Sequence, residues 1–177
     1  NPGNYAITVT DANGCTANSS TTVGNIPPGT ASISNLTNTL CPGSCDGTAT
    51  VSMSGTATAP FIYEWFTNSG LSIGQDSITA INLCAGYYYC VVTDASGCIS
   101  FTNQFDISEP APLSLVVDTD SSNCYASCNG QAVATVSGGT GSYQYQWDDP
   151  LLQITQTAFN LCAGTYTILA TDNNGCT

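Results

Sequence analysis

The sequence predicts an all-β chain of tandem two-sheet sandwich modules that are braced by disulfides. Three observations support this prediction. Blocks of sequence recur at a nearly fixed distance, Thr, Ser, Val and Ile dominate the composition, and cysteines recur at equivalent places in the blocks. β-Branched and aromatic residues favour strands, and tandem copies of one domain repeat both their hydrophobic pattern and their cysteines.

The recurring blocks are of two kinds. A block that contains TDxxGC occurs three times, at residues 3–16, 86–99 and 164–177. A block that contains CxxxC occurs twice, at residues 40–55 and 123–138. Cys41 and Cys124 are 83 residues apart, whereas Cys84 and Cys162 are 78 residues apart. Such a period indicates copies of one domain rather than one large fold.

The period predicts three parts of the chain. We expect the C-terminal part of a preceding repeat at residues 1–28, a complete sandwich repeat at 29–110, and the next repeat, lacking its last strand, at 111–177. The junctions read IPPG and SEPAP. Proline fixes φ and stiffens a short connection, so the modules are expected to sit in line.

Within the complete repeat, short apolar runs are separated by Gly, Pro, Asn and Asp, as in strands joined by turns. The predicted strands are residues 31–36, 48–54, 61–66, 77–83, 87–94 and 98–107. Alternation places one set of side chains on a buried face: Tyr88, Cys90 and Val92, with the counterparts Tyr5, Ile7 and Val9 and the counterparts Tyr166, Ile168 and Ala170. A period of two with one apolar face is typical of a half-buried strand in a sandwich.

A second alternating run ends in tryptophan in both copies: Phe61, Tyr63 and Trp65 match Tyr143, Tyr145 and Trp147. We expect each Trp to fill a core. The TDxxGC segments are predicted hairpin turns, in which Asp11, Asp94 and Asp172 cap the backbone. Calcium ligation by these three aspartates is the alternative, although no DxDxDG spacing accompanies them. Asp148 and Asp149 precede a proline and are expected in a solvated turn.

The composition argues against several classes of function. The chain has no Lys, Arg or His, and 12 acidic residues give a net charge of -12. This charge repels phosphate backbones and anionic lipids, which argues against nucleic-acid and membrane-surface roles. The usual general bases and amine nucleophiles are missing, so we predict no enzyme, no catalytic residue and no cofactor-binding residue. No run approaches the ~20 apolar residues of a membrane span, so membrane insertion of this segment is not expected.

The ten cysteines indicate disulfides formed in an oxidising compartment. A zinc site that uses Cys41 and Cys45 is the competing interpretation, but it lacks a second short knuckle.

Several segments together resemble a known family. VTDANGC at residues 9–15, SGGTGSYQYQW at 137–147 and LCAGTY at 161–166 resemble the SprB-type repeat of giant surface adhesins from gliding bacteria. CxxxC-[DN]-G combined with LCAG, at 41–47 with 83–86 and again at 124–130 with 161–164, is similar to that family as well. The resemblance implies a secreted or cell-surface protein, exported by the type IX system, in which Ig-like or PKD-like modules form an adhesive stalk.

Four cysteines in a unit allow three pairings. Asn1 occupies the place of Cys84, yet Cys15 is retained, which argues against pairing the Cys84 and Cys98 positions with each other. The favoured scheme is Cys41–Cys98 and Cys45–Cys84, with Cys124–Cys176 and Cys128–Cys162 in the next copy, and the swapped scheme stays open. Cys15 is expected to pair upstream, and Cys90 is expected to be a buried free thiol.

Modification and contact sites are also predicted. Asp76-Ser77-Ile78 resembles the O-glycosylation acceptor of these bacteria, and Asn18 and Asn35 fit the N-glycosylation pattern; three unmodified polar segments are the alternative. Tyr87 and Tyr89 point outward if Tyr88 points inward, and they form a candidate interface or sugar-stacking face.

The function that these features favour is structural and adhesive: an extracellular repeat array that forms a cell-surface stalk or filament. A glycan- or protein-binding module that uses loops at the end of each sandwich is the alternative. The expected partners are neighbouring repeats of the same chain, other copies in a filament, and surface glycans or abiotic surfaces.

Overall fold

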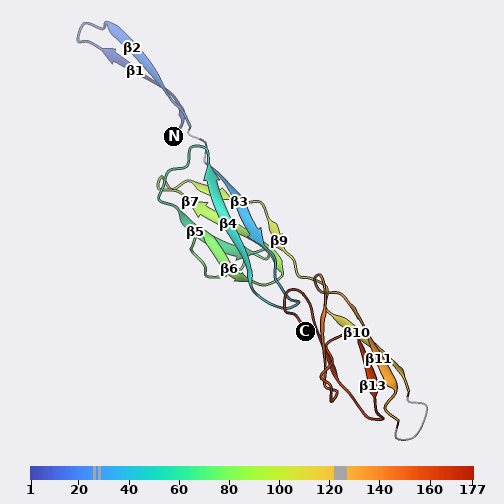
Figure 1. Ribbon diagram of the computed structural model, residues 1–177. Coiled ribbons are helices and arrows are strands. Elements are labelled where there is room, and N and C mark those ends of the chain that lie inside the picture. Colours follow the sequence, from blue (N-terminus) through green and yellow to red (C-terminus); the bar gives the residue numbers. More distant parts are fainter. Residues whose placement is uncertain (26, 28, 122–126) are drawn as a thin grey trace.

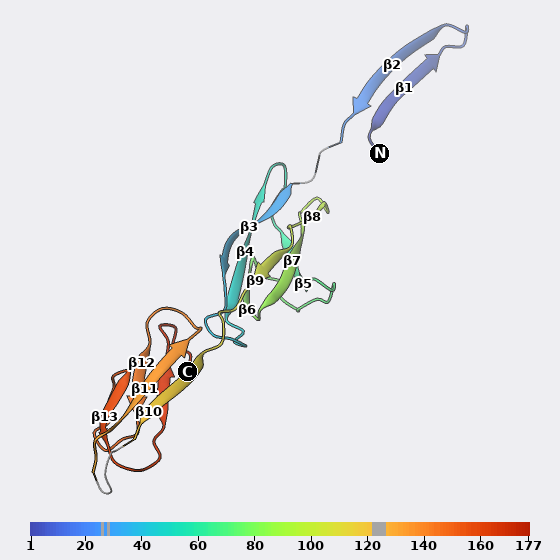
Figure 2. The same cartoon turned by 90° about the vertical axis from the view of Figure 1, so that its right-hand side faces the viewer.

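The computed structural model describes residues 1–25, 27, 29–121 and 127–177. These residues form fourteen β-strands and no helix. A hairpin, a first sandwich and a second sandwich follow one another along a line (Figure 1, Figure 2). The all-β prediction is therefore confirmed, and no helix among the described residues could cross a bilayer.

The N-terminal hairpin consists of β1 (Gly3–Thr10) and β2 (Thr16–Val23), which pair antiparallel from Gly3↔Val23 to Thr10↔Thr16. Every residue of both strands is exposed. The expectation that Tyr5, Ile7 and Val9 are buried is therefore wrong for the described chain. Alternation sets which side chains share a face, but burial requires a second sheet, and none packs on this hairpin in the described residues.

The first sandwich is formed by β3 to β9. One sheet has the order β3-β4-β6, and the other has the order β5-β7-β8 with β9 also paired to β7. The strands are β3 (Thr30–Thr37), β4 (Gly47–Ser54), β5 (Ile62–Thr67), β6 (Thr79–Leu83), β7 (Gly86–Thr93), β8 (Ile99–Phe101) and β9 (Phe105–Ile107). The single strand predicted at 98–107 is thus two strands, because the hydroxyl of Thr102 turns in to accept the Cys90 N–H at 2.9 Å.

The core of the first sandwich lies between its sheets. Trp65, Cys90, Val92 and Ile107 are completely buried there. The indole N–H of Trp65 donates to the Ser77 carbonyl at 2.8 Å, which satisfies the one polar atom of the ring. Trp65 therefore fills the core, as its strand pattern predicts.

The second sandwich is formed by β10 to β14, with sheets β10-β11-β13 and β12-β14. Its strands are β10 (Ser114–Asp120), β11 (Gly130–Ser137), β12 (Gln144–Trp147), β13 (Thr157–Leu161) and β14 (Ile168–Thr171). Trp147 is buried, and its indole N–H donates to the Thr155 carbonyl at 2.9 Å. The two sandwiches therefore share one plan. The domain boundaries after residues 28 and 110 stay predictions.

Candidate functional site at the module junction

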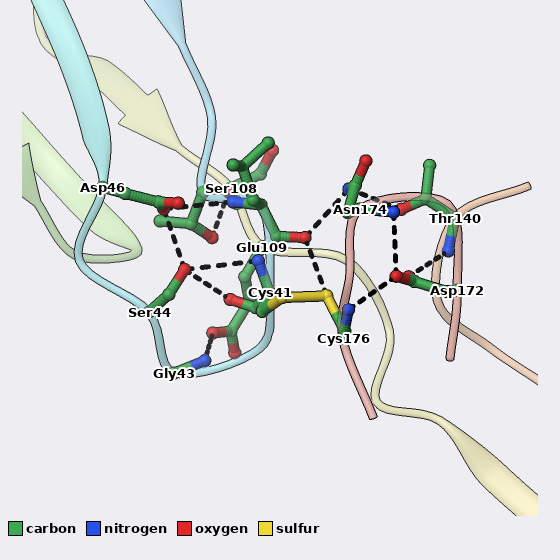
Figure 3. Close-up of a disulfide and its surroundings, with 12 residues drawn as sticks. Cys41, Gly43, Ser44, Asp46, Ser108, Glu109, Thr140, Asp172, Asn174 and Cys176 are labelled. Carbon is green, nitrogen blue, oxygen red and sulfur yellow. Dashed lines mark hydrogen bonds between the residues drawn. A yellow bond between two sulfur atoms is a disulfide. The ribbon is translucent and has the colours of Figure 1, made fainter. Parts of the chain in front are cut away.

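The junction between the two sandwiches is built from one turn, one loop and one linker. The turn contains residues 172–176 and is called the entry turn, because it lies at the end of the sandwich where the chain enters. The loop contains residues 40–46 of the first sandwich and is called the exit loop. The linker contains residues 108–113. Figure 3 shows the turn and the loop facing each other.

The entry turn is organised by one carboxylate. Oδ1 of Asp172 accepts the N–H groups of Asn174 at 2.9 Å and of Cys176 at 2.8 Å, and Oδ2 accepts the N–H of Thr140 at 2.8 Å. Burial opposes the ionisation of Asp172, but these donors outweigh it and lower the pKa of the carboxyl group. Gly175 completes the turn with a positive φ of 87°. The turn therefore holds Cys176 in a fixed direction.

The exit loop is also held by a carboxylate. Asp46 accepts the N–H of Leu40 at 3.1 Å and lies 2.8 Å from the hydroxyl of Ser44. The hydrogen bond from Ser44 is the main reason that the pKa of Asp46 is lowered, and the bond from Leu40 adds to it. Ser44 in turn accepts the N–H of Cys41 at 3.2 Å. This network fixes the start of the CxxxC segment.

A disulfide joins Cys41 of the exit loop to Cys176 of the entry turn, with a Cα–Cα distance of 5.6 Å (Figure 3). The predicted pairs Cys41–Cys98 and Cys124–Cys176 are therefore wrong. The physical reason is the polarity of a sandwich. Cys41 lies beside the outgoing linker, where Thr39 N–H donates to the Ser108 carbonyl at 3.1 Å, whereas Cys98 lies at the end where the chain enters.

Further contacts close the junction around this disulfide. The side-chain amide of Asn174 donates to the Leu40 carbonyl at 2.9 Å across the two modules. The N–H of Gly43 donates to the Glu109 carboxylate at 2.7 Å, which ties the exit loop to the linker. The N–H of Gly139 donates to the Ala111 carbonyl at 2.8 Å, which ties the linker to the second sandwich. The junction is thus held by these three hydrogen bonds in addition to the disulfide and the chain itself.

Close packing of the linker depends on a glycine. A Cβ on Gly138 would lie 2.1 Å from the carbonyl oxygen of Pro112, and this glycine has a positive φ of 81°. A side chain at this position would push the linker away from the second sandwich.

Two other disulfides lie within the sandwiches. They join Cys45 to Cys84 and Cys128 to Cys162, which are the pairs that the sequence analysis favoured. Cys124 lies outside the described residues. Consequently both cysteines of the first CxxxC segment are bonded: Cys45 holds the exit loop to its own sandwich, and Cys41 holds it to the next one.

Three described cysteines form no disulfide in the structure. Cys15 is exposed in the hairpin turn, Cys90 is buried in the first core, and Cys98 is partly exposed in the turn that corresponds to the entry turn. Burial raises the pKa of the Cys90 thiol to about 11, which keeps it protonated and unreactive at neutral pH.

The calcium candidates are spread over the three turns. Oδ1 of Asp11 accepts the N–H groups of Asn13 and Cys15, and Oδ1 of Asp94 accepts those of Ser96 and Cys98. All three aspartates thus cap their turns, as Asp172 does. Within residues 1–25, 27, 29–121 and 127–177, no group of three or more acidic, Cys or His side chains is placed to hold a metal ion.

The remaining candidates lie on the surface. Ser77 is exposed in the segment before β6, Asn18 is exposed on β2, and Asn35 is exposed on β3. Tyr87 is 55% exposed, and Tyr89 is half-buried because its ring stacks on Phe66 at a centroid distance of 5.2 Å. Glycosylation at the first three residues and an interface at the tyrosines stay predictions.

One pair of equivalent side-chain contacts was not predicted from the sequence. The Gln75 side-chain amide pairs with both backbone groups of Ile81, and Gln153 pairs in the same way with Phe159, at 2.8 to 3.0 Å. The signal was the equal spacing of six residues in both copies.

Asp149, expected in a solvated turn, is buried and accepts the N–H groups of Leu151 and Gln153, so that expectation is wrong.

Residues 116–152 match the family model of the SprB repeat. The matched segment covers most of β10, all of β11 and β12, and the turn that holds Asp149, so it lies within the second sandwich. SprB repeats are structural repeats of cell-surface proteins, and the disulfides around this repeat fit an extracellular environment. No curated protein matches the chain.

Proposed function

We propose that this chain is a stretch of an extracellular stalk in which SprB-type modules are held in line by covalently closed junctions. The observation that carries the proposal is the Cys41–Cys176 disulfide, because it joins two consecutive sandwiches rather than bracing one. A linker alone lets two modules bend and twist, whereas a second covalent link beside the linker restricts both motions.

The same bond protects the stalk against tension. Cys41 and Cys176 are 135 positions apart, so a force applied before Cys41 and after Cys176 passes through the disulfide. The residues between them bear no extending load while the bond is intact. Without the bond these 135 positions would lengthen by up to about 450 Å at about 3.3–3.6 Å per residue. The junction therefore suits a module that transmits force from a surface.

The composition agrees with a role outside the cell. With no Lys or Arg, the chain forms no salt bridges between side chains, and its disulfides supply the covalent bracing. A net charge of -12 keeps neighbouring stalks apart at low ionic strength. Export by the type IX system, a role in gliding motility and surface glycosylation are the corresponding proposals that the resemblance adds.

Small-angle X-ray scattering of the oxidised chain tests the stalk. We expect an elongated particle with a narrow distribution of shapes, and a broader distribution for Cys41→Ser/Cys176→Ser, because that variant retains the linker alone. Cys45→Ser/Cys84→Ser is the matched control, since it removes a disulfide without opening the junction. Equal distributions for the oxidised chain and the junction variant would contradict the proposal, as would failure of an antibody against the chain to label intact source cells.

The first sandwich also carries an aromatic face that favours a second function, binding of a glycan. Tyr87 is exposed beside the stacked rings of Tyr89 and Phe66, and sugar rings stack on such faces. A glycan array with the oxidised chain and with Tyr87→Ser tests this function: the variant should lose binding that the unmodified chain shows, and an array without any bound glycan would speak against it.

A further inference from the structure

The turn at residues 94–98 of the first sandwich is built like the entry turn of the second. In both turns the backbone N–H of the aspartate donates to the carbonyl of the cysteine, at 3.0 Å for Asp94 and at 2.9 Å for Asp172. In both, Oδ1 of the aspartate accepts the cysteine N–H, at 2.9 Å and 2.8 Å. Cys98 and Cys176 are therefore presented by the same backbone frame.

The surroundings of the two turns agree as well. The N–H of Ala95 donates to the Thr58 carbonyl at 2.9 Å, and the N–H of Asn173 donates to the Thr140 carbonyl at 3.0 Å. Oδ2 of Asp94 accepts the N–H of Thr58, as Oδ2 of Asp172 accepts the N–H of Thr140. The turn at Cys98 is consequently the entry turn of the first sandwich.

The incoming chain lies against this turn. The hydroxyl of Ser100, two residues after Cys98, donates to the Gly29 carbonyl at 2.6 Å. A Cβ on Gly29 would lie 2.8 Å from the Ser54 carbonyl oxygen, so the linker packs closely here too. Whatever module precedes Gly29 is therefore brought next to Cys98, as the first sandwich is brought next to Cys176.

The two cysteines differ in one respect. Cys176 is buried and bonded to Cys41, whereas Cys98 is partly exposed and unbonded. The part of the chain that precedes the first sandwich is the hairpin, and before Cys41 the sequence holds a single cysteine, Cys15, in the distal hairpin turn. The described chain thus offers the Cys98 turn no exit loop to pair with.

We infer that Cys98 is the half-cystine of a second junction and that its partner is the first cysteine of a CxxxC-[DN]-G exit loop on a preceding copy of the module. This inference rests on the proposed function and extends it from one junction to every junction. Each module is then bonded to the module before it and to the module after it. Because the ring closed by Cys98 and the ring closed by Cys41 share the residues between these two cysteines, consecutive rings overlap along the stalk.

The bond forms by ordinary thiol–disulfide exchange. Two thiols lose two protons and two electrons, and one S–S bond forms between them. The electrons reduce one disulfide of an exported thiol–disulfide oxidoreductase to its dithiol, through a mixed disulfide with one of the two cysteines. In the described junction Ser44 and Asp46 order the exit loop around Cys41. In the second junction Asp94 accepts the Cys98 N–H and holds that cysteine in place after exchange.

Alkylation of the native surface protein tests the inference. The protein is denatured in the presence of iodoacetamide and without reductant. It is then cleaved at acidic and aromatic residues, since these 177 residues contain no Lys or Arg. We expect carbamidomethyl label on Cys90, which is free and only shielded by burial, and none on Cys98. The Cys98 peptide should appear linked to a peptide with the CxxxC pattern. Label on Cys98 equal to that on Cys90 overturns the inference, and so does a link from Cys98 to any other peptide.

The same digest separates the two proposals. Intact Cys41–Cys176 together with alkylated Cys98 rejects the second junction and leaves the stalk, whereas loss of Cys41–Cys176 rejects the observation on which the stalk rests.

A longer recombinant chain gives a controlled version of this test. Residues 30–112, with Cys98→Ser, are placed before residues 30–177, so that a whole module replaces the hairpin. We expect loss of free thiol at Cys98 of the second copy and a link to Cys41 of the first copy. A link from Cys98 to Cys41 of its own copy, with Cys176 left free, would show pairing within a module and overturn the inference.

Discussion

The two sandwiches share their strand plan, but the described residues close the core of the first more completely than that of the second. In the first sandwich, Phe105 of β9 packs edge-on against Trp65 at 6.1 Å, and Ile107 is completely buried. In the second sandwich, Trp147, Leu161 and Tyr166 line a trough of about 400 Å³. These three side chains correspond to Trp65, Leu83 and Tyr88, and in the first sandwich Phe105 of β9 packs against both Trp65 and Tyr88. In the first sandwich the last strand therefore closes the core rather than merely extending a sheet.

Adding a strand like β9 to the second sandwich of this chain should have the largest effect on this difference. We expect that residues 100–109, appended after Thr177, stabilise the second sandwich by about 3–6 kcal/mol, because two apolar side chains become buried at about 1.5–3 kcal/mol each. Hydrogen exchange of the β11 amides measures the gain. The matched control carries serine at the positions of Phe105 and Ile107 in the appended segment. Equal protection by both segments would show that backbone pairing, not apolar burial, closes the core.

The opposite change should make the first sandwich resemble the second. Ile107→Ala removes most of a buried side chain at the position where β9 covers the core, and we expect a loss of about 2–5 kcal/mol. Hydrogen exchange of the β4 amides reports the loss separately from the second sandwich. Phe101→Ala on the exposed face of β8 is the control and should change stability by no more than about 0.5 kcal/mol. A cost for Ile107→Ala no larger than that of the control would show that β9 is dispensable.

The strand pattern of both sandwiches could be predicted because each inward set repeats. The alternation of Tyr88, Cys90 and Val92 gave the correct inward face, and Trp65 and Trp147 ended the matching strands inside their cores. The break at Thr102 could not be predicted, because it depends on a hydrogen bond between the Thr102 side chain and the Cys90 backbone. The alternating pattern also did not predict whether a second sheet packs on Tyr5, Ile7 and Val9.

Two of the disulfides could be predicted from the repeat, whereas the third could not. Cys45–Cys84 and Cys128–Cys162 lie within sandwiches and follow the repeat. The partner of Cys41 could not be found by comparing copies, because equal spacing does not distinguish a cysteine of the same module from its equivalent in the next. That choice depends on the end of the sandwich at which each turn lies, and only the three-dimensional structure supplies it.

A pH titration should reveal a smaller effect at the two entry turns. Hydrogen bonds from backbone N–H groups lower the pKa of Asp94, with the bond from Cys98 as the main cause, and they lower that of Asp172 against its burial. A lowered folded pKa adds stability above the unfolded value of about 3.9, and this stability is lost as the pH falls through the folded pKa. The melting temperature should therefore drop as the pH is lowered below about 4.

Substitutions assign this drop to the turns. Asp94→Asn should reduce the pH dependence of the first sandwich, and Asp172→Asn should reduce that of the second, as followed by hydrogen exchange. Asp106→Asn on the exposed side of β9 is the control. If all three variants keep the full drop at low pH, the turns are not its source.

The smallest expected effect concerns the outer faces of the sandwiches. Where the first sandwich stacks Tyr89 on Phe66 at 5.2 Å, the second has Thr167 donating to Asp148 through its N–H at 2.6 Å and its hydroxyl at 2.7 Å. Equivalent positions thus carry an aromatic pair in one copy and a charge-assisted hydrogen bond in the other.

Single substitutions should separate the two tyrosines. Tyr89→Ser removes one ring of the stacked pair, and we expect a loss of about 0.5–1.5 kcal/mol. Tyr87 is exposed and has no ring partner in the described chain, so Tyr87→Ser should change stability by no more than about 0.5 kcal/mol. Denaturant unfolding measures both values, and Phe66→Ser with Tyr89→Ser completes a double-mutant cycle. A coupling energy near zero would mean that the two rings lie together without stabilising the sheet, and the outer face would then be open to a ligand at both tyrosines rather than at Tyr87 alone.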